Sequence, residues 1–107
     1  MSFRFKLWAA GLFVGLFAIP VFTQSSGETD FKSKCAMCHG TDGLAATPAG
    51  KAMKTPSVKS PEFAKLSESE MIAGTKNGKG KMPAYKDKLT DVQIREVVIY
   101  LRTLEKK

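Results

Sequence analysis

The sequence predicts an all-α domain of three to four short helices joined by long loops. Two segments begin with a hydroxyl residue followed by Glu or Gln at capping-box spacing, and apolar residues at helical spacing come after them. No stretch shows the alternation of a half-exposed strand. The chain has 107 residues, a formal net charge of +7 and 43% hydrophobic residues. These values fit one globular domain and exclude collagen-like, disordered and multi-span membrane classes.

The first 27 residues have the three-part composition of an export signal. Arg4 and Lys6 precede an uncharged apolar run of 16 residues, 7–22, and small polar residues follow. The run is longer than a usual signal-peptide core and shorter than a spanning helix. Residues 1–27 are therefore predicted to be a signal peptide or a retained N-terminal membrane anchor. Both alternatives place residues 28–107, the predicted functional domain, in the periplasm.

The domain is predicted to begin with a helix over Glu28–Cys38, with Ser25 in capping-box position. Residues 40–60 are predicted as loop, because glycine and proline interrupt them repeatedly. Ser60 and Pro61 then start one short helical turn. A loop of this length is uncommon in so small a domain, and it makes sense if it wraps around something large and apolar.

Two further helices begin at matching signals. Ser67 and Glu70 form one capping box, and Gly78 ends that helix. Thr90 and Gln93 repeat the pattern before the last helix. That helix carries a single apolar stripe, made of Ile94, Val97, Val98, Leu101 and Leu104.

The domain is poor in large apolar side chains. Beyond the leader its aromatic residues are Phe31, Phe63, Tyr85 and Tyr100. A domain of about 80 residues buries only about 60% of its unfolded surface, so its stability is marginal without an additional stabilising link or cofactor. Two cysteines cannot make a disulfide-dense scaffold, and one histidine cannot make a multi-histidine metal site.

A stabilising cofactor is indicated by the segment Cys35-Ala36-Met37-Cys38-His39, which has the C-x-x-C-H spacing of haem c attachment. Residues three apart on a helix project to the same side, so Cys35 and Cys38 can each bond one vinyl edge of a single porphyrin. His39 then lies under the ring, where its imidazole can bind iron. The sequence therefore predicts one covalently attached haem c, which also supplies the missing apolar core.

Three other uses of the motif fit less well. A structural zinc site takes four ligands, and cysteine and histidine supply only three here. A thioredoxin-like dithiol expects a βαβ setting, which the sequence lacks. A plain disulfide suits an exported protein but explains neither His39 nor the poor core.

The second axial position of the iron needs another residue, because His39 is the only histidine. Met1 belongs to the leader, and Met37 is too close to the His39 side of the ring. Met71 is placed to pack against Leu66 across the start of its helix.

Two methionines remain as candidate ligands. Met53 lies in the long loop, and its position does not exclude it. Met82 lies in an irregular segment between two predicted helices, and Pro83 stiffens the backbone beside it. Histidine with methionine is an established haem ligand pair. The sequence therefore predicts His39 and Met82 as the metal ligands.

Residues 27–105 resemble a small bacterial class I monohaem c-type cytochrome. The resemblance rests on the attachment motif and on three further segments, Gly27-x-x-x-Phe31, Met82-Pro83-Ala84-Tyr85 and Val97 to Leu101. It implies a cytochrome c-like fold in which the first helix crosses the last, with contacts among Gly27, Phe31, Val97 and Tyr100. It also implies a hydrogen bond from the proximal histidine to a loop proline carbonyl, for which Pro48 is the candidate. The domain lacks the tryptophan that many relatives place near a haem propionate.

Iron ligated on both sides has no open position for a substrate. The sequence therefore predicts a periplasmic electron carrier and not an enzyme. One alternative is a tethered cytochrome subunit of a larger dehydrogenase or oxidase complex, with residues 7–22 as its membrane contact. A haem enzyme such as a peroxidase, from which Met82 dissociates, is another. A haem-free dithiol protein is the third.

The charge pattern suggests the kind of partner. The two long loops are rich in lysine, at Lys51, Lys54, Lys59, Lys76, Lys79, Lys81, Lys86 and Lys88. A basic rim would steer a monomeric carrier toward redox proteins of an electron-transfer chain that bear acidic docking patches. The alternative is a solvated surface with no partner. Nucleic-acid binding is not expected, because basic and aromatic residues do not interleave.

Overall fold

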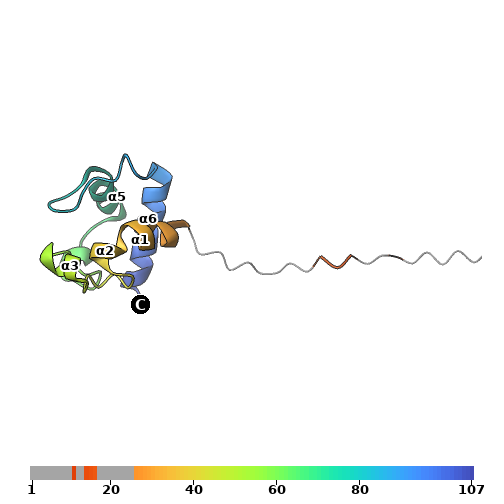
Figure 1. The fold of residues 1–107 in the computed structure, drawn as a ribbon, viewed down its shortest axis with the longest axis horizontal. Helices are drawn as coiled ribbons and strands as arrows, with labels where there is room; N and C mark the ends of the chain where they lie inside the picture. Colours follow the sequence, from red (N-terminus) through yellow and green to blue (C-terminus); the bar gives the residue numbers. More distant parts are fainter. Residues whose placement is uncertain (1–10, 12–13, 17–25) are drawn as a thin grey trace, which may run out of the picture.

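The computed structural model describes residues 11, 14–16 and 26–107 (Figure 1). The leader predicted over residues 1–27, with Ser25, lies mostly outside these residues. Residues 26–107 form helices and no strand beyond one isolated bridge, which confirms the all-α class. The helices are α1 (Ser26–Lys34), α2 (Ala36–His39), α3 (Pro48–Ala52), α4 (Pro61–Ala64), α5 (Glu68–Asn77) and α6 (Asp91–Glu105). Among the described residues, no helix has the length and apolar content of a membrane span.

The first predicted helix, Glu28–Cys38, is two helices in the structure. α1 begins at Ser26 and ends at Lys34, and α2 is a single turn. Cys35 separates them with a φ of −114°, which is outside the usual helical range. Gly40 ends α2 with a φ of +74°, a value that favours glycine. The apolar pattern did not reveal this break, because it lies in the dihedral angles of one residue.

The loop prediction over residues 40–60 was wrong at α3. Thr47 caps this helix by accepting a hydrogen bond from the Gly50 amide at 2.9 Å, and Pro48 occupies its first turn. The same pair of signals before α4 was interpreted correctly. There the Ser60 hydroxyl accepts from the Phe63 amide at 3.2 Å.

Both predicted capping boxes are confirmed. In each, the hydroxyl of the capping residue accepts from the third helical amide, and the Glu70 or Gln93 side chain accepts from the capping residue's amide. Gly78 follows α5 with a φ of +82°. The predicted stripe of α6 is buried as a whole, at Ile94, Val97, Val98, Leu101 and Leu104.

α1 packs across α6, as the resemblance implied (Figure 1). Gly27 lies at the crossing, where a Cβ would clash with the backbone oxygen of Glu96. The Ser26 hydroxyl donates to the Glu96 carboxylate. Phe31 is fully buried, and its ring centroid is 5.4 Å from that of Tyr100. The absence of a side chain at Gly27 therefore lets the two backbones touch.

The hydrophobic core includes this crossing and extends beyond it. It joins the α6 stripe to Phe31, Cys35, Val58, Phe63, Met71 and Leu89. The Arg102 guanidinium donates to the Leu66 carbonyl and lies 5.5 Å from the Phe63 ring centroid, so it ties α6 to the segment between α4 and α5. Because Cys35 belongs to this core, one end of the attachment motif is fixed by it.

We expect Gly27→Ala to lower the free energy of unfolding of the cofactor-loaded protein by about 1–3 kcal/mol, the usual cost of overpacking. The added Cβ meets helix backbone, which cannot move aside independently of α6. Urea unfolding of both proteins measures the difference.

Gly74→Ala in α5 is the matched control, since the nearest atom to its added Cβ is 3.9 Å away. This variant should gain up to about 1 kcal/mol from helix propensity. Equal effects of the two substitutions would contradict a close backbone contact at Gly27.

Candidate haem-attachment site

The two cysteines lie where α1 meets α2, and both are free thiols. Cys35 is buried and Cys38 half-buried. Burial, with a smaller contribution from the charge of Asp30, raises the pKa of the Cys35 thiol to about 11. A redox dithiol or a metal thiolate needs a lowered pKa. The environment of Cys35 therefore does not favour a thioredoxin-like or zinc-binding use of the pair.

His39 ends α2 and packs against the core, with its ring centroid 6.3 Å from that of Phe31. Its Nδ1 is buried and has no hydrogen-bond partner among the described residues. Burial lowers the pKa of His39, which favours the neutral imidazole that binds metals. A buried, unpaired ring nitrogen calls for an explanation, and ligation through the ring is a common one.

The expected hydrogen bond from His39 to Pro48 is absent, since Nδ1 has no partner. Pro48 is the first residue of α3.

Thr47 and Gly50 hold the carbonyl end of the motif, and sequence reasoning missed both roles. The Thr47 hydroxyl donates to the Met37 carbonyl at 2.6 Å and lies 3.2 Å from the carbonyl oxygen of Cys38. A Cβ on Gly50 would clash with the same Cys38 oxygen. The signal for α3 was the Thr47-Pro48 pair. The carbonyls that the hydroxyl reaches depend on how α3 packs on α2.

Met82 lies at the base of a tight turn. Its backbone pairs with that of Lys79 through two hydrogen bonds, of 3.0 and 3.1 Å, and Gly80 in the turn has a φ of +58°. A Cβ on Gly78 would come within 3.0 Å of the Met82 carbonyl oxygen. The Met82 side chain is half-buried. The turn therefore fixes the backbone of the predicted distal ligand.

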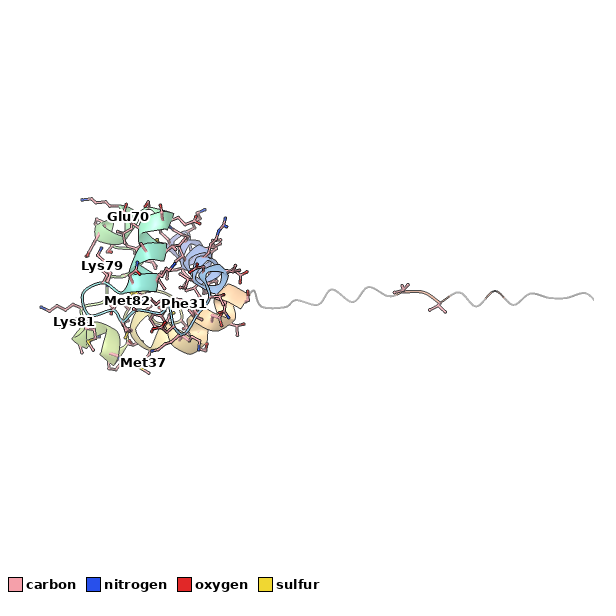
Figure 2. All side chains as sticks on the ribbon, turned by 90° about the horizontal axis from the view of Figure 1, so that it is seen from above. Phe31, Met37, Glu70, Lys79, Lys81 and Met82 are labelled. Atoms are coloured by element: carbon pink, nitrogen blue, oxygen red, sulfur yellow. The ribbon has the colours of Figure 1, made fainter. Side chains whose placement is uncertain are left out.

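Tyr85 joins the Met82 segment to the cysteine motif. Its hydroxyl donates to the Lys34 carbonyl at 3.1 Å, and Lys34 directly precedes Cys35. α2, α3 and the loop 78–88 border the same end of the domain, opposite the start of α1 (Figure 1). Figure 2 labels Met82 and Met37 at this end. The structure thus brings together the two segments that carry the four predicted site residues.

The other described methionines are placed differently. Met71 is buried in the core, in agreement with its predicted packing role. Met37 is 78% exposed and Met53, just after α3, is 49% exposed. Partial burial distinguishes Met82 from both of the exposed methionines.

These residues suit a covalently attached porphyrin. One free thiol lies at the start of α2 and the other within it, a neutral imidazole with an unpaired nitrogen follows, and Phe31 and the core form an apolar wall. Two surface hollows beside α1 and α6 include none of the four predicted site residues. The donor set, and not a preformed substrate pocket, therefore indicates the function.

Comparisons with known proteins agree with this chemistry. The family model described as "Cytochrome C oxidase, cbb3-type, subunit III" matches residues 23–101. Cytochrome c6 of Thermostichus vulcanus is 33% identical over 94 residues, covering 87% of this chain and 81% of the relative. Cytochrome c6 of a Nostoc strain is 32% identical over 101 residues, covering 92% and 88%.

Solved structures show the same fold. The KustC0563 c-type cytochrome aligns with a TM-score of 0.67 and 28% identity, covering 73% of this chain and 95% of its own. Cytochrome c6 of the diatom Phaeodactylum tricornutum aligns with a TM-score of 0.58 and 26% identity, covering 76% and 92%. Because the family model spans most of the chain and these relatives share its fold, the chain belongs to the family of small c-type cytochromes that carry covalently bound haem c.

Proposed function

We propose that the protein is a periplasmic one-electron carrier in which Cys35 and Cys38 attach the haem and His39 and Met82 bind its iron. The observation that carries this proposal is the buried, unpaired Nδ1 of His39 beside two free thiols. The hydrogen bond from Tyr85 to Lys34 adds support, because it brings the loop 78–88, which we call the Met82 loop, to the same motif. When bound, the haem supplies a one-electron redox centre.

The protein's own side chains account for a carrier better than for an enzyme. If His39 and Met82 both bind the iron, no coordination position would remain for oxygen, peroxide or an organic substrate. A thioether ligand raises the potential. Apolar packing around Phe31 keeps water from the proximal side. We therefore expect a positive midpoint potential and no catalytic turnover.

Exposed lysines at the end of the domain formed by α2, α3 and the Met82 loop suit an acidic partner. Lys79, Lys81 and Lys86 are exposed on the Met82 loop, and Lys51 and Lys54 are exposed at α3. Within residues 26–107 these five side chains make no ion pair, whereas Lys76 pairs with Asp91 at 3.1 Å. Unpaired charge next to the redox group raises encounter rates with oppositely charged partners. Redox proteins with acidic docking patches are therefore the proposed partners, met by a monomeric carrier.

A tethered subunit of an oxidase complex is the second candidate, because the matching family model describes an oxidase subunit. We favour the free carrier, since the cytochrome c6 relatives are covered over 81% and 88% of their length. Fractionation of cells that make the full chain separates the two. A free carrier enters the periplasmic fraction, and a subunit stays with the membrane and a stoichiometric partner.

We expect Met82→Ala to abolish the weak ferric methionine-to-iron charge-transfer band and to lower the midpoint potential. Axial ligands set haem potentials over about 0.8 V, so loss of one should cost on the order of 0.1–0.3 V. An optical redox titration measures both quantities. Met53→Ala is the control and should keep the band, and loss of the band in that variant alone would assign the ligand to Met53.

We expect the double variant Cys35→Ala with Cys38→Ala to fail to retain haem covalently and to be largely unfolded. The core of this small domain is marginal without the porphyrin. Mass measurement of the denatured protein reports attachment, and far-ultraviolet circular dichroism reports helix content. Native-like helix content in this variant would show that the core needs no cofactor.

We expect the rate of oxidation of the reduced protein by ferricyanide, an anionic probe, to fall as salt rises above about 0.1 M. Lys79→Gln with Lys81→Gln should lower the low-salt rate by about two- to fivefold, because a local positive field is removed. Lys106→Gln with Lys107→Gln removes the same charge beyond the end of α6 and should have a smaller effect. Equal effects of the two double variants would show that net charge, and not the basic rim, governs the encounter.

A further inference from the structure

Tyr85 connects two parts of the site that the chain sequence keeps far apart. Its hydroxyl donates to the Lys34 carbonyl at 3.1 Å, across 51 positions of the chain. Lys34 is the last residue of α1, and Cys35 follows it. This side-chain bond therefore runs from the Met82 loop directly to the segment that bears the attachment motif.

The backbone of Tyr85 is held as firmly as its hydroxyl. Its amide donates to the Thr75 carbonyl at 3.0 Å, and its carbonyl accepts from the Leu89 amide at 2.9 Å. Leu89 is buried in the core. Tyr85 is thus anchored to α5, to the core and, through its side chain, to α1.

Met82 lies between this anchor and the tight turn at Lys79. Only two residues, Pro83 and Ala84, separate Met82 from Tyr85 along the chain, and Pro83 restricts the backbone between them. A chain segment this short and stiff transmits the position of one residue to the other. Movement of Tyr85 away from Lys34 would therefore carry the Met82 side chain with it.

The tyrosine hydroxyl is suited to remain a donor. Burial, with smaller contributions from the Cys35 and Cys38 thiols, raises the pKa of Tyr85 above its usual value. The Lys88 ammonium lies over the Tyr85 ring, 5.3 Å from its centroid. The attraction between the cation and the aromatic face helps to hold the ring in place. The hydroxyl therefore keeps its proton throughout the neutral range.

We propose that Tyr85 is a positioning residue for the distal ligand, with its hydroxyl holding the Met82 loop against the haem-attachment segment by the bond to Lys34. This inference rests on the proposed ligation by Met82 and adds to it. The bond keeps Met82 near the attachment segment. Without it the loop retains its ties to α5 but opens more easily on the α1 side.

The test is competition for the position of Met82 in the ferric, haem-loaded protein. Imidazole is titrated into the parent and into Tyr85→Phe, and the methionine-to-iron charge-transfer band is followed. One hydrogen bond to a neutral group contributes about twofold to tenfold in an equilibrium constant. We therefore expect imidazole to bind Tyr85→Phe about twofold to tenfold more tightly, with a weaker band before any addition.

Tyr100→Phe is the matched control, because it removes the other phenol hydroxyl of the domain. Tyr100 packs on Phe31 at the α1–α6 crossing and lines surface hollows there. This variant should bind imidazole as the parent does. Urea unfolding of both variants separates a local effect at the ligand from a general loss of stability.

Met82→Ala, titrated in parallel, separates failure of this inference from failure of the proposed function. If Met82→Ala loses the band and Tyr85→Phe binds imidazole like the parent, the positioning role is refuted and the ligation stands. An equal gain in affinity in Tyr85→Phe and Tyr100→Phe refutes the positioning role as well. If Met82→Ala keeps the band, ligation by Met82 is wrong, and the role of Tyr85 fails with it.

Discussion

The contact between α1 and α6 is the interaction on which the rest of the structure depends. It is possible because Gly27 has no side chain where the two backbones touch, and Phe31 then fills the core one turn later. The Cys35 amide donates to the Phe31 carbonyl at 2.8 Å, so the attachment motif extends directly from this buried residue. The crossing therefore sets the position of the cysteines and of the histidine that follows them.

The two segments of the proposed site are held by different means. At the attachment motif, α3 packs against α2, with the Thr47 hydroxyl and Gly50 in contact with the carbonyls of the motif. Met82, the proposed second ligand, lies on a loop, and loops tend to move unless side chains hold them. The turn at Lys79 and the bond from Tyr85 supply that restraint. A domain with a small core can thus hold both segments of the proposed site in place.

The protonation of Cys35 and His39 limits the chemistry that the site can support. The Cys35 thiol has a raised pKa, which does not favour thiol exchange, and His39 is disposed to stay neutral. A carrier needs a redox group with both coordination positions filled and an accessible edge. Lys79 and Lys81 are exposed near Met82 (Figure 2), and Lys51 and Lys54 are exposed at α3. The residues proposed for attachment, ligation and docking therefore lie in two loops and one helical turn.

The sequence by itself determined the all-α class, both capping boxes, the buried stripe of α6 and the haem motif, because each depends on residues close together in the chain. It also indicated the α1–α6 contact through a family resemblance. The break at Cys35, the helix at Pro48 and the unpaired Nδ1 of His39 were not foreseen. The first depends on one residue's dihedral angles, and the second carried a Thr47-Pro48 signal that loop-like neighbours obscured. The state of Nδ1, like the bond from Tyr85 to Lys34, was decided only by tertiary structure, because distant segments must pack before any hydrogen-bond partner can be assigned.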